Sequence, residues 1–205
     1  MKRPRIKLVV LSLIAGSIAS LAPASHADTV TDVATPFLAG PRIDFRIVIP
    51  AFLRFRVGTN VVGTVDQILF DMTATPGNVG NGTAILGTGG DAGTSVANVS
   101  VQGNNGQITI TPTNSSAGLG LGTGTAADGF IPYTQITTTA SLAALPAPTL
   151  TNVGGAAVLP TLSAGKVTDR TGTWTYQYAN TTVPSAGNYG TSVNGGRVTY
   201  TATMP

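Results

Sequence analysis

The stretch RIDFRIVIPAFLRFRV, residues 42–57, decides the fold class of this 205-residue chain. Every odd-numbered position in it is apolar, whereas all of its charged side chains lie at even-numbered positions. Successive side chains of a β-strand point to opposite faces, so the alternation predicts a strand with one buried and one solvated face. Pro50 cannot donate to a sheet. It therefore predicts either two strands joined by a kink or bulge, or one edge strand that changes sheet.

The same period of two recurs along the chain, separated by glycine, proline and asparagine, while Glu, Lys and Gln, which favour helices, are scarce. The runs lie at residues 65–72, 96–101, 107–111, 130–138, 173–179 and 197–204. The sequence Gly-Asn-Asn-Gly at 103–106 suits a tight turn and predicts a hairpin between the second and third of these runs. We expect an all-β, antiparallel immunoglobulin-like or jelly-roll sandwich of about 8–10 strands over residues 41–205, after an N-terminal arm at 28–40.

The N-terminus has the pattern of a secretory signal peptide. Four basic residues within the first seven precede an apolar run at 8–22, and Ser25-His26-Ala27 provides a small-x-small cleavage site. We therefore expect residues 1–27 to be removed, which leaves 178 residues with seven basic side chains, eight aspartates and a formal charge of −1. This charge argues against nucleic-acid binding, and the apolar run is too short for a membrane anchor. The expected location is extracellular or on the cell surface, with the periplasm as the alternative.

The expected mature chain has no Cys, no Glu and no His. Zinc sites and nucleophilic triads need these residue types. The aspartates are scattered, and the neighbouring pair Asp66 and Asp71 has opposite parity, which places the two on opposite faces of a strand. We expect no enzymatic activity, no cofactor and no metal site.

The last thirty residues resemble a known group of domains. The motif Trp174-x-Tyr176-x-Tyr178, then Ala186-Gly187-x-Tyr189, then Arg197-Val198-Thr199-Tyr200-Thr201, resembles the closing strands of bacterial exported immunoglobulin-like β-sandwich domains. These include WxL-type surface domains and fimbrial or spore-coat-U-like subunits. The chain departs from them in having Tyr176 where a WxL motif has Leu, no disulfide, and Met204 where pilins often carry Tyr. The resemblance implies a sandwich fold together with cell-wall binding or polymerisation.

Export, low charge and strands throughout predict a structural or adhesive subunit of the bacterial surface, such as part of a surface layer or fimbria-like assembly. Its expected partners are copies of itself or other envelope proteins. The arm at 28–40 either donates a strand to a neighbour or stays self-packed or disordered. The alternative function is a secreted carbohydrate-binding module, with polysaccharide as the partner.

Two sets of side chains are candidates for binding or assembly. Trp174, Tyr176 and Tyr178 share one strand face, which either stacks on sugar rings or packs into the core. The second set shares the even parity of the opening stretch and consists of Arg42, Arg46, Arg54 and Arg56. If that strand is continuous, these arginines line one surface. That surface either meets acidic polysaccharide, lipid headgroups or a partner's carboxylates, or is a solvated edge.

Overall fold

A computed structural model describes residues 29–205 of the chain, so the predicted signal peptide at 1–27 lies outside the described residues. The chain divides into a part that ends at Val48 and a compact body that spans Ile49–Pro205. The body therefore begins eight residues later than the domain start that the sequence predicts.

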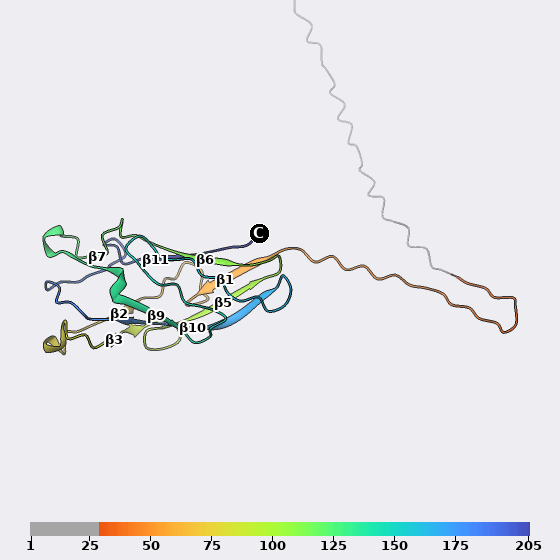
Figure 1. Cartoon of the computed structure of the whole chain (residues 1–205), viewed down its shortest axis with the longest axis horizontal. Helices are drawn as coiled ribbons and strands as arrows, with labels where there is room; N and C mark the ends of the chain where they lie inside the picture. The colour runs from red at the N-terminus through yellow and green to blue at the C-terminus, as the bar shows by residue number, and fades with distance from the viewer. Residues whose placement is uncertain (1–28) are drawn as a thin grey trace, which may run out of the picture. The chain divides into compact units, whose positions relative to one another are not determined.

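The expectation of an all-β, antiparallel fold is confirmed (Figure 1). Within residues 29–205 the secondary structure consists of strands and three short 3-10 helices, and no helix is long and apolar enough to cross a membrane. The strands are β1 Leu53–Val57, β2 Ile68–Leu69, β3 Ile85–Leu86, β4 Thr88–Gly89, β5 Val96–Gly103, β6 Thr109–Asn114, β7 Leu121–Gly122, β8 Phe130–Ile131, β9 Ile136–Ala140, β10 Thr168–Tyr178 and β11 Val198–Thr203. The helices are η1 Pro76–Asn78, η2 Ala126–Asp128 and η3 Tyr133–Gln135.

The main sheet has the order β1-β5-β10, and β10 also pairs with β9 and β3. Its register places Val101 of β5 between Phe55 of β1 and Arg170 of β10. A second sheet consists of β11 and β6, with Tyr200 opposite Pro112. Two small sheets, β2-β4 and β7-β8, complete the body.

The core lies between the main sheet and the β6-β11 sheet. Alternate residues of β5 and β10 are buried, and they meet apolar side chains from residues 108–110. The side chains of Val99, Val101, Ile108, Ile110 and Trp174 are all fully buried. Burial of a side chain of this size is worth about 1.5–3 kcal/mol, so this cluster accounts for much of the stability.

The predicted hairpin between 96–101 and 107–111 is wrong. β5 pairs with β1 and β10, whereas β6 pairs with β11, so the turn at 103–106 carries the chain from one sheet to the other. The alternation in both runs is real, because each strand buries one face. Those faces meet across the core instead of lying side by side in one sheet.

The predicted strand over 42–57 is also corrected. β1 covers only Leu53–Val57, where the predicted parity holds: Phe55 and Val57 pack against the core, and Arg54 and Arg56 lie on the outer side. Residues 42–52 belong to no strand. Pro50 lacks a backbone N–H, which explains why the ladder stops near this point.

Candidate functional site

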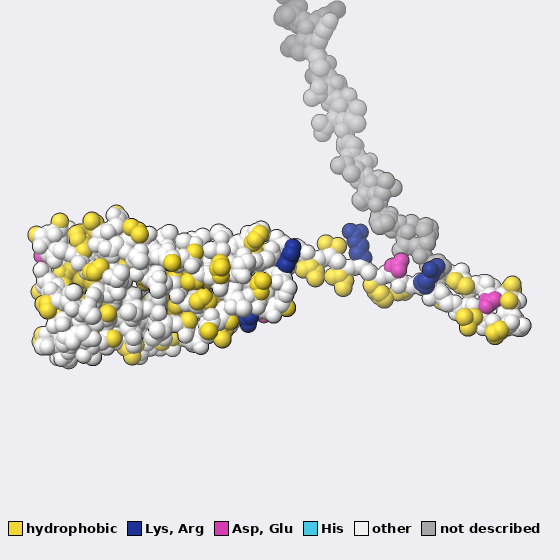
Figure 2. Space-filling model, in the orientation of Figure 1, with side chains coloured by type: hydrophobic (Ala, Val, Ile, Leu, Met, Phe, Trp, Pro, Cys, Tyr) yellow, Lys and Arg dark blue, Asp and Glu magenta, His cyan; other side chains and the backbone are white. Residues whose placement is uncertain are grey.

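Residues 42–49, which we call the apolar segment, have the side-chain pattern of a half-buried strand without the burial. Ile43, Phe45, Ile47 and Ile49 are 74–89% exposed, and Figure 2 shows apolar side chains along the segment. Single exposed apolar residues are common, but four at a spacing of two form a continuous apolar face. Such a face is typical of a strand that pairs with a sheet edge and covers a core.

Asn104 fixes the residues of the body that directly follow this segment. The side-chain amide of Asn104 donates to the carbonyl oxygen of Pro50 at 2.8 Å, and its Oδ1 accepts from the N–H of Phe52 at 2.9 Å. Next to it, Asn105 Nδ2 donates to the oxygen of Pro205 at 2.8 Å. Residues 50–52 and the C-terminus therefore lie at the same end of the body.

β1 and β11 are the edge strands whose side chains reach the core from neighbouring ends of the two larger sheets. Within the described residues, β1 pairs only with β5, and β11 pairs only with β6. The two strands approach each other, and side chains of both pack against the core cluster, namely Phe55, Val57, Tyr200 and Ala202. An unpaired edge presents a row of backbone N–H and C=O groups that can bond to another strand. A strand added at either edge would place its side chains beside the core.

The four arginines do not share one strand, because the ladder begins only at Leu53. Arg42 and Arg46 lie in the part of the chain before the body, whereas Arg54 and Arg56 line a shallow hollow of about 550 Å³ on the outer face of the main sheet. Arg54 Nη1 lies 3.4 Å from Gln102 Oε1, which accepts its hydrogen bond.

The aromatic row of β10 lies in the core. Trp174 is 0% exposed, and Tyr176 and Tyr178 are also buried. Trp174 Nε1 donates to the carbonyl oxygen of Leu145 at 3.2 Å, and its ring lies 5.2 Å from that of Tyr200. The interpretation of these three residues as a sugar-stacking platform is therefore wrong, because their faces are covered by the body itself.

Burial also sets the acidity of the tyrosines. Tyr176 and Tyr200 form a hydrogen bond between their hydroxyl oxygens at 3.1 Å. Desolvation raises the pKa of Tyr176 to about 12, and it raises the pKa of Tyr200 well above the ordinary value of 10.0. Both hydroxyls therefore stay protonated near neutral pH, where they serve as structural hydrogen-bonding groups.

The carboxylates do not gather into a site. Residues 29–205 contain no group of three or more Asp side chains that could hold a metal ion. Backbone N–H groups of Ala34 and Leu38 bond to Asp32 and lower its pKa, and the N–H and hydroxyl of Thr73 do the same for Asp71. These carboxylates cap local turns.

The alternation over residues 42–57 does not predict that the apolar segment is separate from β1. The available signal was the pair of prolines, Pro41 and Pro50, that bracket eight alternating residues. Nor does the sequence predict the role of Asn104, which was interpreted only as a turn residue but anchors residues 50–52.

Comparisons with protein-family models, with curated proteins and with solved structures return no match for this chain.

Proposed function

We propose that this chain is an exported structural or adhesive subunit of the bacterial surface, and that it assembles by adding its apolar segment as a strand to a neighbouring copy. The observation that carries the proposal is the exposed apolar face of Ile43, Phe45, Ile47 and Ile49. The role is non-enzymatic, in keeping with an expected mature chain that has no Cys, Glu or His.

Strand addition explains why apolar residues occupy every second position of the apolar segment. The backbone of an added strand bonds to a free edge, and alternate side chains enter the acceptor. Burying each of the four large apolar side chains contributes about 1.5–3 kcal/mol to association, in addition to the backbone hydrogen bonds made with the acceptor edge. None of this free energy is gained while the face stays exposed to water.

The acceptor we favour is the free edge of β1 or β11. Both are edge strands beside the core, and both are long enough to pair with several residues of a donor. Charged side chains are a usual protection of a sheet edge. β11 carries none, whereas β1 carries Arg54 and Arg56, so charge opposes association less at β11. Figure 2 shows mainly uncharged atoms on the visible face of the body.

The test uses two neighbouring residues of opposite parity. Ile47 is 83% exposed and Val48 is 75% exposed, and both are β-branched aliphatic residues. Ile47→Asp places a carboxylate on the apolar face, whereas Val48→Asp places it on the opposite face. The association of the full exported chain is measured by sedimentation velocity over a concentration series. We expect Ile47→Asp to weaken association by about 100-fold or more, and Val48→Asp to change it by less than about fivefold.

The two variants separate strand addition from general stickiness. If the apolar residues act merely as a sticky patch, both substitutions weaken association equally, and the proposal fails. It fails as well if the unsubstituted chain stays monomeric at every concentration.

A further inference from the structure

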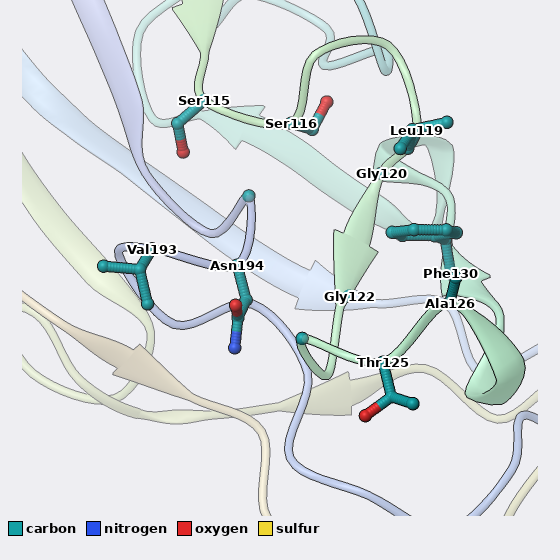
Figure 3. A pocket seen from close by; sticks show the side chains of 12 residues that line it. Ser115, Ser116, Leu119, Gly120, Gly122, Thr125, Ala126, Phe130, Val193 and Asn194 are labelled. Carbon is teal, nitrogen blue, oxygen red and sulfur yellow. The ribbon is translucent and has the colours of Figure 1, made fainter.

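The end of the body opposite the apolar segment's anchor contains a cavity of about 280 Å³. It lies around β7 and β8 and is lined by 12 residues that lie within 115–130 and 193–195 (Figure 3). Ser115 and Ser116 follow β6, whose other end lies near residues 104–108. The cavity thus lies where the chain enters β11, at the other end of the body from the anchor of the apolar segment.

Glycines at alternate positions form one side of this cavity. The sequence Gly118-Leu-Gly-Leu-Gly-Thr-Gly124 places Gly120, Gly122 and Gly124 at the lining, and β7 lies within it. Two of these glycines, Gly120 and Gly124, have a positive φ, which favours glycine. A Cβ atom on Gly120 would also lie 2.6 Å from the backbone oxygen of Ile131, so glycine lets the chain segments pack closely around the cavity.

Phe130 forms an apolar wall next to these glycines. A Cβ atom on Gly122 would lie 2.7 Å from Cε1 of Phe130, so the ring occupies space that only glycine leaves open. Phe130 as a whole residue is nevertheless 40% exposed. Figure 3 shows it beside Gly120 and Gly122. One part of the ring packs on the strand, and the rest is available to a ligand.

Asn194 supplies an amide without a partner. Within residues 29–205 its side chain makes no hydrogen bond, although its backbone is well fixed: its N–H donates to the oxygen of Thr191 at 2.9 Å, and its oxygen accepts from the N–H of Gly122 at 3.0 Å. The half-buried amide offers both a donor and an acceptor at the cavity.

The surroundings of Asn194 are rigid. The hydroxyl of buried Tyr133 donates to the oxygen of Gly195 at 2.6 Å, and Gly190 N donates to the oxygen of Gly122 at 3.0 Å. These bonds hold residues 190–195 against β7. A preformed site loses less entropy on binding than a flexible one.

From this arrangement we propose that the cavity binds a neutral hexopyranose residue of a glycan. None of the lining side chains is charged, which disfavours an anionic or cationic ligand. An exposed aromatic ring suits the C–H face of a sugar, and an amide that both donates and accepts suits neighbouring hydroxyls. The volume has room for about one pyranose ring, at the lower limit of usual ligand sites. This activity is additional to assembly.

The test is saturation-transfer NMR on the full exported chain with three probes: methyl α-mannopyranoside, methyl α-glucopyranoside and methyl β-galactopyranoside. The method observes the small ligand, so it works whether or not the chain assembles. We expect at least one probe to bind, and Asn194→Ala to weaken its binding by about tenfold. Phe130→Leu keeps an apolar side chain but removes the aromatic face, so it should weaken binding more than Phe130→Tyr does.

Ser192→Ala is the matched control, because Ser192 neighbours the loop but does not line the cavity. It should bind the probe as the unsubstituted chain does. Fluorescence of buried Trp174 verifies that each variant is folded. The proposal is overturned if none of the three glycosides binds. Equal binding by the Asn194→Ala variant would also overturn it, as would stronger binding of methyl glucuronide than of the neutral probes.

Discussion

The side chain of Asn180 connects two parts of the body that are far apart in sequence. It is fully buried directly after β10, and its φ of 54° is in the left-handed region that asparagine tolerates. Its Oδ1 accepts from Gly80 N at 2.7 Å, and its Nδ2 donates to the oxygen of Asn78 at 2.8 Å and to that of Thr83 at 3.3 Å. It therefore ties the loop at 78–83 to the end of the longest strand.

We expect Asn180→Ala to destabilise the body by about 3 kcal/mol, because it leaves buried backbone groups unpaired and places alanine at a positive φ. Urea unfolding measures this loss. Asn188→Ala, at an exposed position, is the control and should change stability by less than about 0.5 kcal/mol. Equal stability of the two variants would show that the hydrogen bonds of Asn180 do not stabilise the body.

The buried tyrosine Tyr176 allows a pH prediction. The pKa of Tyr176 is about 12 in the folded chain, compared with 10.0 for an ordinary tyrosine. Because the folded state holds its proton more tightly, this contribution to stability is complete below pH 10 and is lost as pH rises through 12. We expect the thermal midpoint to fall over this range and the fall to be smaller in Tyr176→Phe. A midpoint that is independent of pH there would contradict the assigned burial.

For single residues, the sequence predicts burial correctly where the alternation of side chains alone decides which face is buried. The alternation at 53–57 correctly separates Phe55 and Val57 from Arg54 and Arg56, and the aromatic row at 174–178 is buried, which was one of the two interpretations. Asn180 and Asn194 gave no such signal. Their roles depend on contacts with residues that lie far away in sequence.

For the elements, the sequence predicts the positions of strands better than it predicts which strands pair with one another. The runs at 173–179 and 197–204 match β10 and β11, but β5 and β6 pair in different sheets although a turn sequence lies between them. A period of two shows that one face is buried, and it does not specify the neighbouring strand. The same is true of residues 42–52. Their pattern predicts a strand, but no strand of the body pairs with them.

Removing residues 29–48 tests whether the apolar segment belongs to the fold of the body. We expect the shortened chain to unfold within about 3 °C of the full chain, because the core cluster lies entirely within Ile49–Pro205. Differential scanning calorimetry in dilute solution measures the midpoint. A midpoint lowered by much more would mean that the segment packs into its own body. We also expect the deletion to abolish association.

In the whole molecule, the two proposed activities use opposite ends of the body. Asn104 anchors residues 50–52 at one end, and the cavity with Phe130 and Asn194 lies near β7 at the other (Figure 1). Assembly through the apolar segment would display many copies of the cavity, and linked copies bind a repetitive glycan more strongly than a single copy does. If both proposals hold, the free sheet edges would serve association and the cavity would serve recognition.

The most direct measurement of the central claim is amide hydrogen exchange over residues 42–49, followed by NMR or mass spectrometry at low and at high protein concentration. Strand addition predicts that these amides exchange freely in dilute monomer and become protected in the assembled fraction, since their N–H groups then bond to a neighbour's edge. Protection should coincide with slower exchange at the edge of β1 or β11. Free exchange of residues 42–49 in fully assembled protein would contradict the account.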